Sequence, residues 1–385
     1  MYLILLLLPL SFLAYKVSRD TFNPVFLMSS SYIFVSAIIL WTSDILTYDF
    51  KVETQLFIFG NIFVFSLFSF CGSGLIKGKD INFGESIKIH SNTLFVLLCF
   101  FSLSYIIVRI AGYNVSLQEI KNSLHEIRTE EVADGHSAVQ YFFTLIYIVW
   151  GYYLIARKIK SSSKILLIVL MMLLLVVAVV STSKQATFML FISTFFITTR
   201  RKFKSIVMFA FLGLALFSFF SFIIRTNTNS SFWEALKTYL AIYVSSPTIA
   251  MQEFYLLSSK IADSNLIRIF MKIAGFAVPE TLHREFVYVG VPTNVYTAFS
   301  DYVFYGWTVS YIMMALHGFI CGLLWKLSKM FIWAKVFYSL FAYTIIFTFF
   351  HESLVTSLSL WLQLLLLSVL FSCCYKVQKN YVIRD

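Results

Sequence analysis

The chain's long polar interruption opens with Ile224-Arg225-Thr226-Asn227 and closes with Pro292-Thr293-Asn294-Val295-Tyr296-Thr297-Ala298-Phe299-Ser300-Asp301. On both sides of it, apolar segments long enough to cross a membrane follow one another with short connections. A connection of this length is usually functional or disordered, and its aromatic and aliphatic content argues against disorder. The sequence therefore predicts a folded external cap over residues 225–302 that covers a site.

The composition is that of a membrane protein. The 385 residues are 59% hydrophobic and 13% charged, with a mean hydropathy of +0.82, whereas a soluble domain carries about 25% charged residues. The net charge of +11 is compatible with nucleic-acid binding, but the excess of basic residues lies in short clusters between apolar segments. Because the positive-inside rule explains that placement, we expect membrane lipids and no nucleic acid as partners.

The apolar segments predict an all-α, polytopic protein with about 11 transmembrane helices. The expected spans cover residues 2–15, 25–41, 54–76, 91–111, 138–156, 165–181, 184–199, 203–224, 303–325, 332–350 and 353–375. The chain then divides into three parts. These are eight spans in 1–224, the cap in 225–302, and three spans with a short tail in 303–385.

Charge alternates between the two sides of this arrangement. Basic clusters such as Lys16 with Arg19 occupy every second connection, and acidic or mixed connections, such as the one with Asp44 and Asp49, lie between them. This alternation predicts a periplasmic N-terminus and a cytoplasmic C-terminus. The first segment has no basic residue before it, so we expect a retained span and no cleaved signal peptide.

Three other external segments are informative. Helical spacing predicts a surface helix within 112–140, and a tight polar turn spans 181–185. The third is the turn His351-Glu352-Ser353 between the last two spans. Glycine and proline interruptions do not recur in matched halves, which weakens a transporter hypothesis.

Four cations on the external side are candidate ligands for an anion. Lys184 follows Ser181-Thr182-Ser183 with almost no loop, so it is either a snorkelling interfacial lysine or a cation that faces a cavity. Arg225 ends a span and is either an interfacial anchor or a paired donor to phosphate. Arg268 belongs to a stretch that also reads as an amphipathic surface helix, while Arg284 is the stronger ligand candidate in the cap.

The cap also contains semi-apolar pieces, 239–251 and 266–278, which are apolar enough to lie against a bilayer. In the last external turn, His351 is a candidate proton acceptor, and Glu352 requires a partner or a water-filled cavity. A satisfied interfacial pair is the structural alternative for these two residues. The sequence shows no metal-ligand spacing, Gly-rich phosphate loop or nucleophile elbow, so we expect no metal and no cofactor.

The external cations beside spans rich in Phe and Leu fit an amphiphile with an anionic head and an apolar tail. At this point the run from Pro292 to Trp307, which enters a span with Gly318 and Gly322, resembles the O-antigen polymerases (Wzy-type). The 181–185 turn resembles that family's small-residue turn before a basic position, with Lys184 where arginine is common.

The resemblance implies a GT-C-like glycosyltransferase in the bacterial inner membrane. Its substrate would be an oligosaccharide repeat unit on undecaprenyl pyrophosphate, and its partners would include a chain-length-regulator protein. The growing glycan would pass to a sugar hydroxyl of the next lipid-linked unit at the periplasmic face. An O-antigen ligase and a lipid-linked oligosaccharide flippase are the alternatives.

Residue roles follow from this reaction. Lys184, Arg225 and Arg284, with Arg268 in reserve, would stabilise the leaving pyrophosphate without a metal. The base that takes the proton from the acceptor hydroxyl would be one of His351, Glu352 and Asp301. Asn294 and Tyr296 would contact sugar rings, by hydrogen bonding and stacking respectively.

Overall fold

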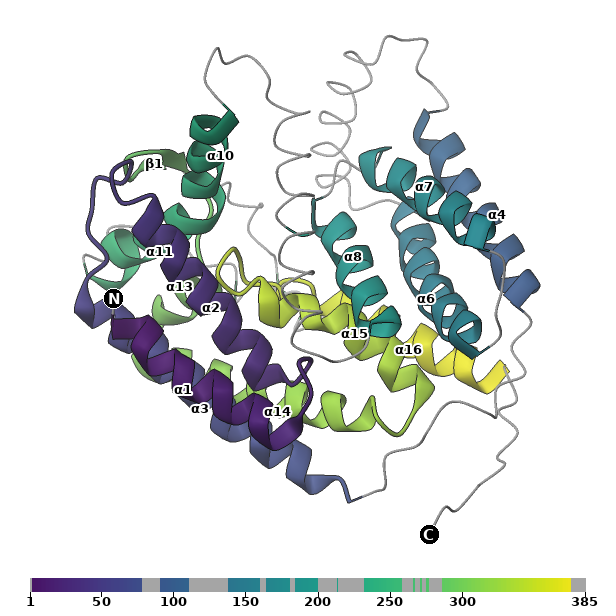
Figure 1. Cartoon of the computed structure of the whole chain (residues 1–385), viewed down its shortest axis with the longest axis horizontal. Coiled ribbons are helices and arrows are strands. Elements are labelled where there is room, and N and C mark those ends of the chain that lie inside the picture. Colours follow the sequence, from purple (N-terminus) through teal and green to yellow (C-terminus); the bar gives the residue numbers. More distant parts are fainter. Residues whose placement is uncertain are drawn as a thin grey trace. The chain divides into compact units, whose positions relative to one another are not determined.

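The structure of the chain is a computed structural model. It describes residues 2–77, 91–110, 138–159, 164–180, 184–199, 213, 232–257, 266, 271, 275–276 and 286–374. Apart from one short hairpin, the regular elements of these ranges are helices (Figure 1). The predicted eighth span, 203–224, and the predicted surface helix within 112–140 lie almost entirely outside the described residues.

The long helices coincide closely with the predicted spans. They are α1 (Tyr2–Ser18), α2 (Pro24–Trp41), α3 (Val52–Leu75), α4 (Ser91–Ile110), α6 (Ala138–Ile159), α7 (Lys164–Val180), α8 (Lys184–Thr198), α14 (Trp307–Leu327), α15 (Ile332–Ile346) and α16 (Leu358–Cys374). Among described residues, α2, α3 and α14 are long and apolar enough to cross a membrane, and most of the others are shorter apolar helices. The chain is therefore a mainly helical membrane protein.

Three predicted boundaries near the cap were wrong. The ninth span begins at Trp307 instead of residue 303, because Gly306 adopts a φ of +105° and turns the chain. The tenth span ends at Ile346 instead of residue 350, and the eleventh begins at Leu358 instead of residue 353. The reason is that residues 347–357 form a series of turns between α15 and α16. The candidate site lies at these two breaks between long helices, the segment that ends at Gly306 and the turns of residues 347–357.

Packing divides the chain into two units. The first comprises Met1–Lys77, Arg200–Lys326 and Thr344–Leu358, and the second comprises Gly78–Thr199, Leu327–Tyr343 and Ser359–Asp385. In the second unit, Tyr152 of α6 donates to the Ser368 carbonyl of α16 at 2.6 Å, and Trp150 donates to Thr194 of α8 at 2.8 Å.

In the first unit, α3 and α14 cross unusually closely. A Cβ added to Gly318 would lie 2.2 Å from the Phe65 carbonyl oxygen, and one added to Gly322 would lie 2.0 Å from that of Ser69. Small residues allow membrane helices this close approach. A bond of 2.8 Å from Ser310 to Asn61 joins the same two helices, so the start of α14 has a fixed position.

The described part of the cap begins with one continuous helical segment. It consists of α10 (Phe232–Leu240), the π-helix η1 (Ala241–Ser245), α11 (Ser246–Met251) and the π-helix η2 (Gln252–Leu256). Residues 244–252 are all buried, so most of 239–251 packs inside the first unit and not against the bilayer. The reason is that η1 packs on α2 within the first unit. Most of 266–278 lies outside the described residues.

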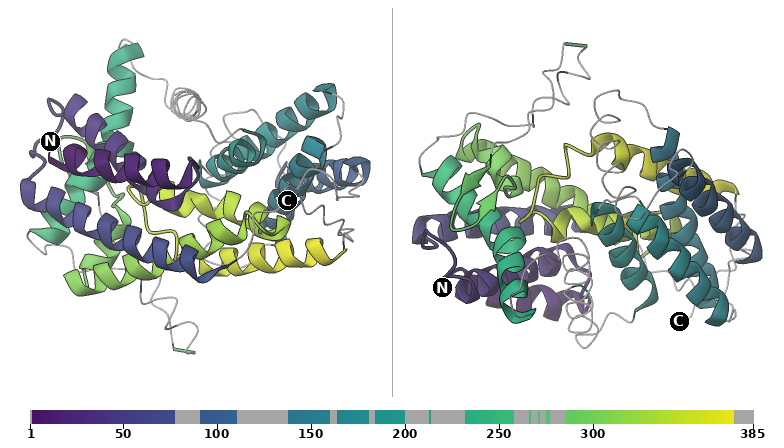
Figure 2. Two further views of the ribbon diagram at one scale, coloured as in Figure 1. Left: turned by 60° about the horizontal axis from the view of Figure 1, so that its bottom comes forward. Right: turned by 90° about the horizontal axis from the view of Figure 1, so that it is seen from above.

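The cap then returns through a hairpin and a short helix. Strands β1 (Val287–Tyr288) and β2 (Pro292–Thr293) pair antiparallel, with Val287 opposite Thr293. Gly290 has a φ of +98°, and an added Cβ would lie 2.1 Å from the Ile45 carbonyl oxygen. The hairpin therefore docks on the α2–α3 loop before the chain enters α13 (Ala298–Val303) (Figure 2).

Candidate active site

A buried carboxylate organises the turn between α15 and α16. Glu352 is 3% exposed. Its Oε1 accepts hydrogen bonds from the Tyr302 hydroxyl and the Val355 N–H, both at 2.9 Å, and its Oε2 accepts one from the Thr356 N–H at 2.8 Å. The Thr356 hydroxyl in turn donates to the Glu352 carbonyl. Both carboxylate oxygens are thus already engaged, which is how a buried charge is tolerated.

The short helix α13, which forms the end of the cap, packs against this turn. The Ala298 N–H donates to the Thr348 carbonyl at 2.8 Å. The Phe299 ring packs against Tyr32 of α2 and Phe57 of α3, with centroids 5.5 and 6.0 Å apart. These contacts fix the end of α13 where Tyr302 reaches Glu352.

All three candidate bases belong to this cluster. Asp301 is 4% exposed, and its charge acts on Glu352. Burial raises the pKa of Glu352, the nearby Asp301 adds to the rise, and the three hydrogen-bond donors oppose it. Burial and the neighbouring Glu352 also raise the pKa of Tyr302, so its hydroxyl keeps its proton.

His351 differs from its two neighbours because it is half-buried instead of buried. Its ring packs edge-on against Phe350 at 5.6 Å, and Phe350 packs on Tyr243 of η1 at 6.2 Å. Burial lowers the pKa of His351 to about 4. The imidazole is therefore neutral at neutral pH and has the protonation state of a base.

The two candidate sugar contacts lie just before α13. Asn294 is half-buried, whereas Tyr296 is only 1% exposed, with its ring 5.1 Å from that of Tyr255 in η2. A sugar can stack on Tyr296 only if the residues that bury its ring move. Thr297 and Ser300 beside it are fully buried, and their hydroxyls have no hydrogen-bond partner in the described part of the chain.

The candidate cations are placed only in part. Lys184 is the first residue of α8 in the second unit, and its side chain lies outside the described part. Arg225, Arg268 and Arg284 are also outside the described residues. Their convergence on a pyrophosphate therefore stays a prediction.

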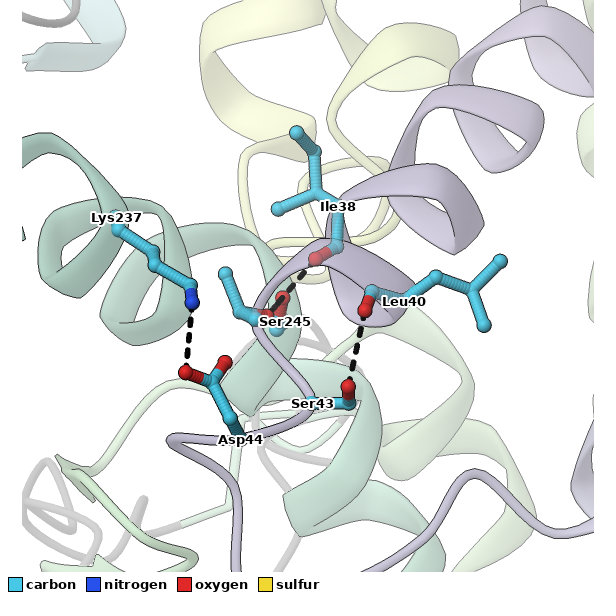
Figure 3. A network of polar contacts seen from close by, with 7 residues as sticks. Ile38, Leu40, Ser43, Asp44, Lys237 and Ser245 are labelled. Atoms are coloured by element: carbon cyan, nitrogen blue, oxygen red, sulfur yellow. Dashed lines mark hydrogen bonds and ion pairs between the residues drawn. The ribbon is translucent and has the colours of Figure 1, made fainter. Parts of the chain in front are cut away.

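The sequence did not reveal how the cap is held. Lys237 of α10 pairs with Asp44 at 2.7 Å, and Thr42 and Ser245 share a hydrogen bond of 2.8 Å (Figure 3). Buried Gln252 joins the same loop, since its Oε1 accepts from the Lys51 N–H at 2.9 Å and its Nε2 donates to the Asp49 carbonyl at 2.8 Å. The sequence indicates a role for Gln252 only through its position, because this amide directly follows the apolar run Ile249-Ala250-Met251.

Chemically, the cluster offers buried carboxylates, a tyrosine hydroxyl and a neutral imidazole. Such groups take up, hold and release protons. Within the described ranges, no group of three His, Cys, Asp or Glu side chains is arranged to hold a metal ion.

Comparison with known proteins extends the resemblance over the whole chain. The sequence is 32% identical, over 386 residues, to a protein of Escherichia coli (strain K12) named "Putative O-antigen polymerase", and the match covers 96% of both chains. No protein-family model matches the chain, and no solved structure matches it. The chain therefore belongs to the family of the O-antigen polymerases, membrane proteins of lipopolysaccharide biosynthesis.

Proposed function

We propose that this protein is a GT-C-like glycosyltransferase of the bacterial inner membrane that polymerises oligosaccharide repeat units at the periplasmic face. The donor glycan leaves undecaprenyl pyrophosphate and joins a sugar hydroxyl of the next lipid-linked unit. The relative's name supports the general activity. The observation that carries the mechanism is the cluster of His351, Glu352 and Asp301 in interruptions between apolar helices.

His351 is the best candidate for the general base. Both oxygens of Glu352 already accept hydrogen bonds, and the carboxylate is 3% exposed. Asp301 is equally inaccessible at 4%. His351 alone among the three is half-buried, and its imidazole is neutral at neutral pH.

The reaction then runs as one displacement. His351 takes the proton of the acceptor hydroxyl, whose oxygen attacks the anomeric carbon of the donor sugar. The bond between that carbon and the pyrophosphate oxygen breaks, and the pyrophosphate leaves with the electron pair. Glu352 and Tyr302 hold the turn that carries His351, so they position the base.

The leaving group gains negative charge as the bond breaks. We assign Lys184, Arg225 and Arg284 to its stabilisation, with Arg268 in reserve, because fixed cations lower such a barrier without a metal. Asn294 and Tyr296 are assigned to the sugar rings. In this proposal a metal chelator leaves the rate unchanged.

An O-antigen ligase and a lipid-linked oligosaccharide flippase are the competing functions. Deletion of the gene separates them from a polymerase. A polymerase mutant leaves lipopolysaccharide with a single repeat unit on the core, because units are still made, moved and ligated. Bare core would contradict the proposal. Loss of chain-length control without loss of polymer, when a chain-length-regulator protein is removed, would identify that protein as the partner.

A further inference from the structure

The first unit contains a cavity that is separate from the base cluster. It has a volume of about 200 Å³ and lies where the first turns of α1 and α3 meet the last turns of α2. Its lining is formed by Leu3, Ile4, Ser36, Ile39, Leu40, Ser43, Leu46, Tyr48, Asp49, Phe50 and Gln55. A bond of 3.0 Å from the Leu3 N–H to the Gln55 side chain holds α1 and α3 together beside it.

The wall of this cavity is effectively apolar. Ser36 and Ser43 donate their hydroxyl protons to backbone carbonyls of α2. The Gln55 Oε1 accepts a hydrogen bond from the Leu3 N–H, and its Nε2 donates one to the Phe50 carbonyl. With these polar groups satisfied, the surface left for a ligand is mostly aliphatic. Apolar cavities of about 150 Å³ take up hydrocarbons of benzene size, so a space of this size and lining suits a segment of an acyl chain.

The mouth is acidic. The Asp49 side chain is exposed, and its carboxylate has no hydrogen-bond or ion-pair partner among the described residues. Among the described residues, the two cations of this loop and of α10 are paired, Lys51 with Glu253 at 3.1 Å and Lys237 with Asp44 at 2.7 Å. A pyrophosphate head would therefore meet a negative charge, whereas an ammonium group would be attracted.

The helices around the cavity identify the surrounding medium. Both α2 and α3 have the length and hydropathy of membrane spans, and Leu5 and Leu56 next to the lining are 64% and 52% exposed. Exposed apolar side chains on helices of this kind mark a surface that contacts lipid. The cavity thus lies at one end of three apolar helices, where the acyl chains of a bilayer would meet the head groups.

We propose that this cavity is a binding site for one zwitterionic phospholipid. The upper part of an acyl chain fills the aliphatic space, and the head-group ammonium pairs with Asp49. The site is distinct from the proposed glycan chemistry and does not depend on it. The α2–α3 loop forms part of the cavity wall, and Gln252 of the cap binds this same loop. A bound lipid would therefore stabilise the loop on which the cap is held.

Photolabelling in nanodiscs tests this proposal. Phosphatidylethanolamine that carries a diazirine near the ester end of its acyl chain should label the peptide of residues 36–50 in the wild-type protein. Ile4→Trp fills the cavity from α1 and should abolish that label. Leu5→Trp places the same bulk one residue away in lipid and should preserve it.

Head-group recognition is tested separately. Asp49→Asn removes the charge but keeps the carbonyl that Gln252 binds, so it should reduce labelling by phosphatidylethanolamine to the level given by phosphatidylglycerol. The proposal is overturned if Ile4→Trp retains the label while correctly folded by size-exclusion chromatography. It is also overturned if a photoreactive polyprenyl phosphate labels 36–50 in preference to the phospholipid, or if Asp49→Asn changes nothing.

Discussion

Tyr302 and Glu352 illustrate how single residues build the candidate site. They are 50 positions apart in the sequence and share a buried hydrogen bond of 2.9 Å. The bond connects the cap, through α13, to the turn that presents His351. Removal of one partner leaves a buried carboxylate less satisfied, and that loss costs more than an average hydrogen bond contributes.

The variant Tyr302→Phe should therefore destabilise the protein by about 1–3 kcal/mol, because Oε1 of Glu352 keeps only the Val355 N–H as donor. Thermal unfolding of the purified protein in detergent measures this loss. Tyr288→Phe is the matched control, since Tyr288 is 65% exposed and should unfold like the wild type. Equal midpoints for the two variants would show that the bond is unimportant.

The lowered pKa of His351 makes a prediction about acidity. Because burial favours the neutral imidazole and lowers its pKa to about 4, the base stays unprotonated as the pH falls from 7 to 5. The value of kcat/KM for polymerisation should therefore decline only when the pH approaches about 4. His351→Gln should lose activity about a hundredfold or more. An acid limb near the ordinary histidine value of about 6.5 would contradict this environment.

The residue-scale features were predictable only in part from the sequence. His351 and Glu352 are recognisable because a polar pair between two long apolar runs requires an explanation. Tyr302 is not, since a tyrosine beside a span reads as an interfacial aromatic. Gln252 binds Lys51 across a separation of 201 residues, and no local pattern encodes such a contact.

At the scale of elements, the crossing of α3 and α14 positions everything that follows the cap. Its glycines face backbone carbonyls, which cannot move aside as a flexible side chain would. Overpacking of such a contact typically costs about 1–3 kcal/mol. The position of α14 therefore depends on the two glycines, because only residues without a side chain let its backbone approach α3 this closely.

Gly318→Ala and Gly322→Ala should each lower the thermal midpoint, because the new methyl group would lie 2.2 or 2.0 Å from a carbonyl oxygen. Gly74→Ala provides the comparison within α3, where an added Cβ meets nothing within 4 Å. That variant should unfold at or above the wild-type temperature, since alanine favours helix. If all three behave alike, the helices do not cross this closely.

The cap is fastened to the α2–α3 loop by contacts of unequal value. The ion pair between Lys237 and Asp44 is partly exposed, and such pairs contribute little. Gln252 is fully buried and satisfies two backbone groups of the loop. Loss of its amide would leave those groups unpaired, which is the costly case.

Gln252→Ala should consequently speed hydrogen exchange throughout Phe232–Leu256 far more than Lys237→Ala does. Exchange measured by mass spectrometry in detergent gives the comparison directly. High salt should reproduce the small effect of Lys237→Ala but not that of Gln252→Ala, because screening weakens exposed charges only. A larger effect from the exposed pair would reverse the ranking.

Element boundaries show what hydropathy can and cannot locate. The predicted span 25–41 and the observed α2 agree almost residue for residue, because bilayer thickness sets the length of an apolar helix. The break at Gly306 escaped prediction, since the residues on both sides of it, Val303 and Trp307, are apolar. A turn inside an apolar run leaves no trace in a hydropathy average.

At the scale of the whole molecule, the proposed reaction takes place at the external face of a mainly helical membrane protein. The family and the membrane character are established by the 32% identity over 96% of the chain and by the apolar helices. The orientation, with a periplasmic N-terminus, and the convergence of distant cations are predictions from charge placement. Both involve segments from the whole length of the chain.

Synthesis by the purified protein tests the central claim most directly. Liposomes that contain the protein and defined lipid-linked repeat units should produce a ladder of longer glycans, resolved by electrophoresis. Arg225→Ala and Arg284→Ala should insert normally and yield no ladder, because the pyrophosphate would leave without charge stabilisation. Translocation of the units without any ladder, or normal chain lengths from both variants, would contradict the account.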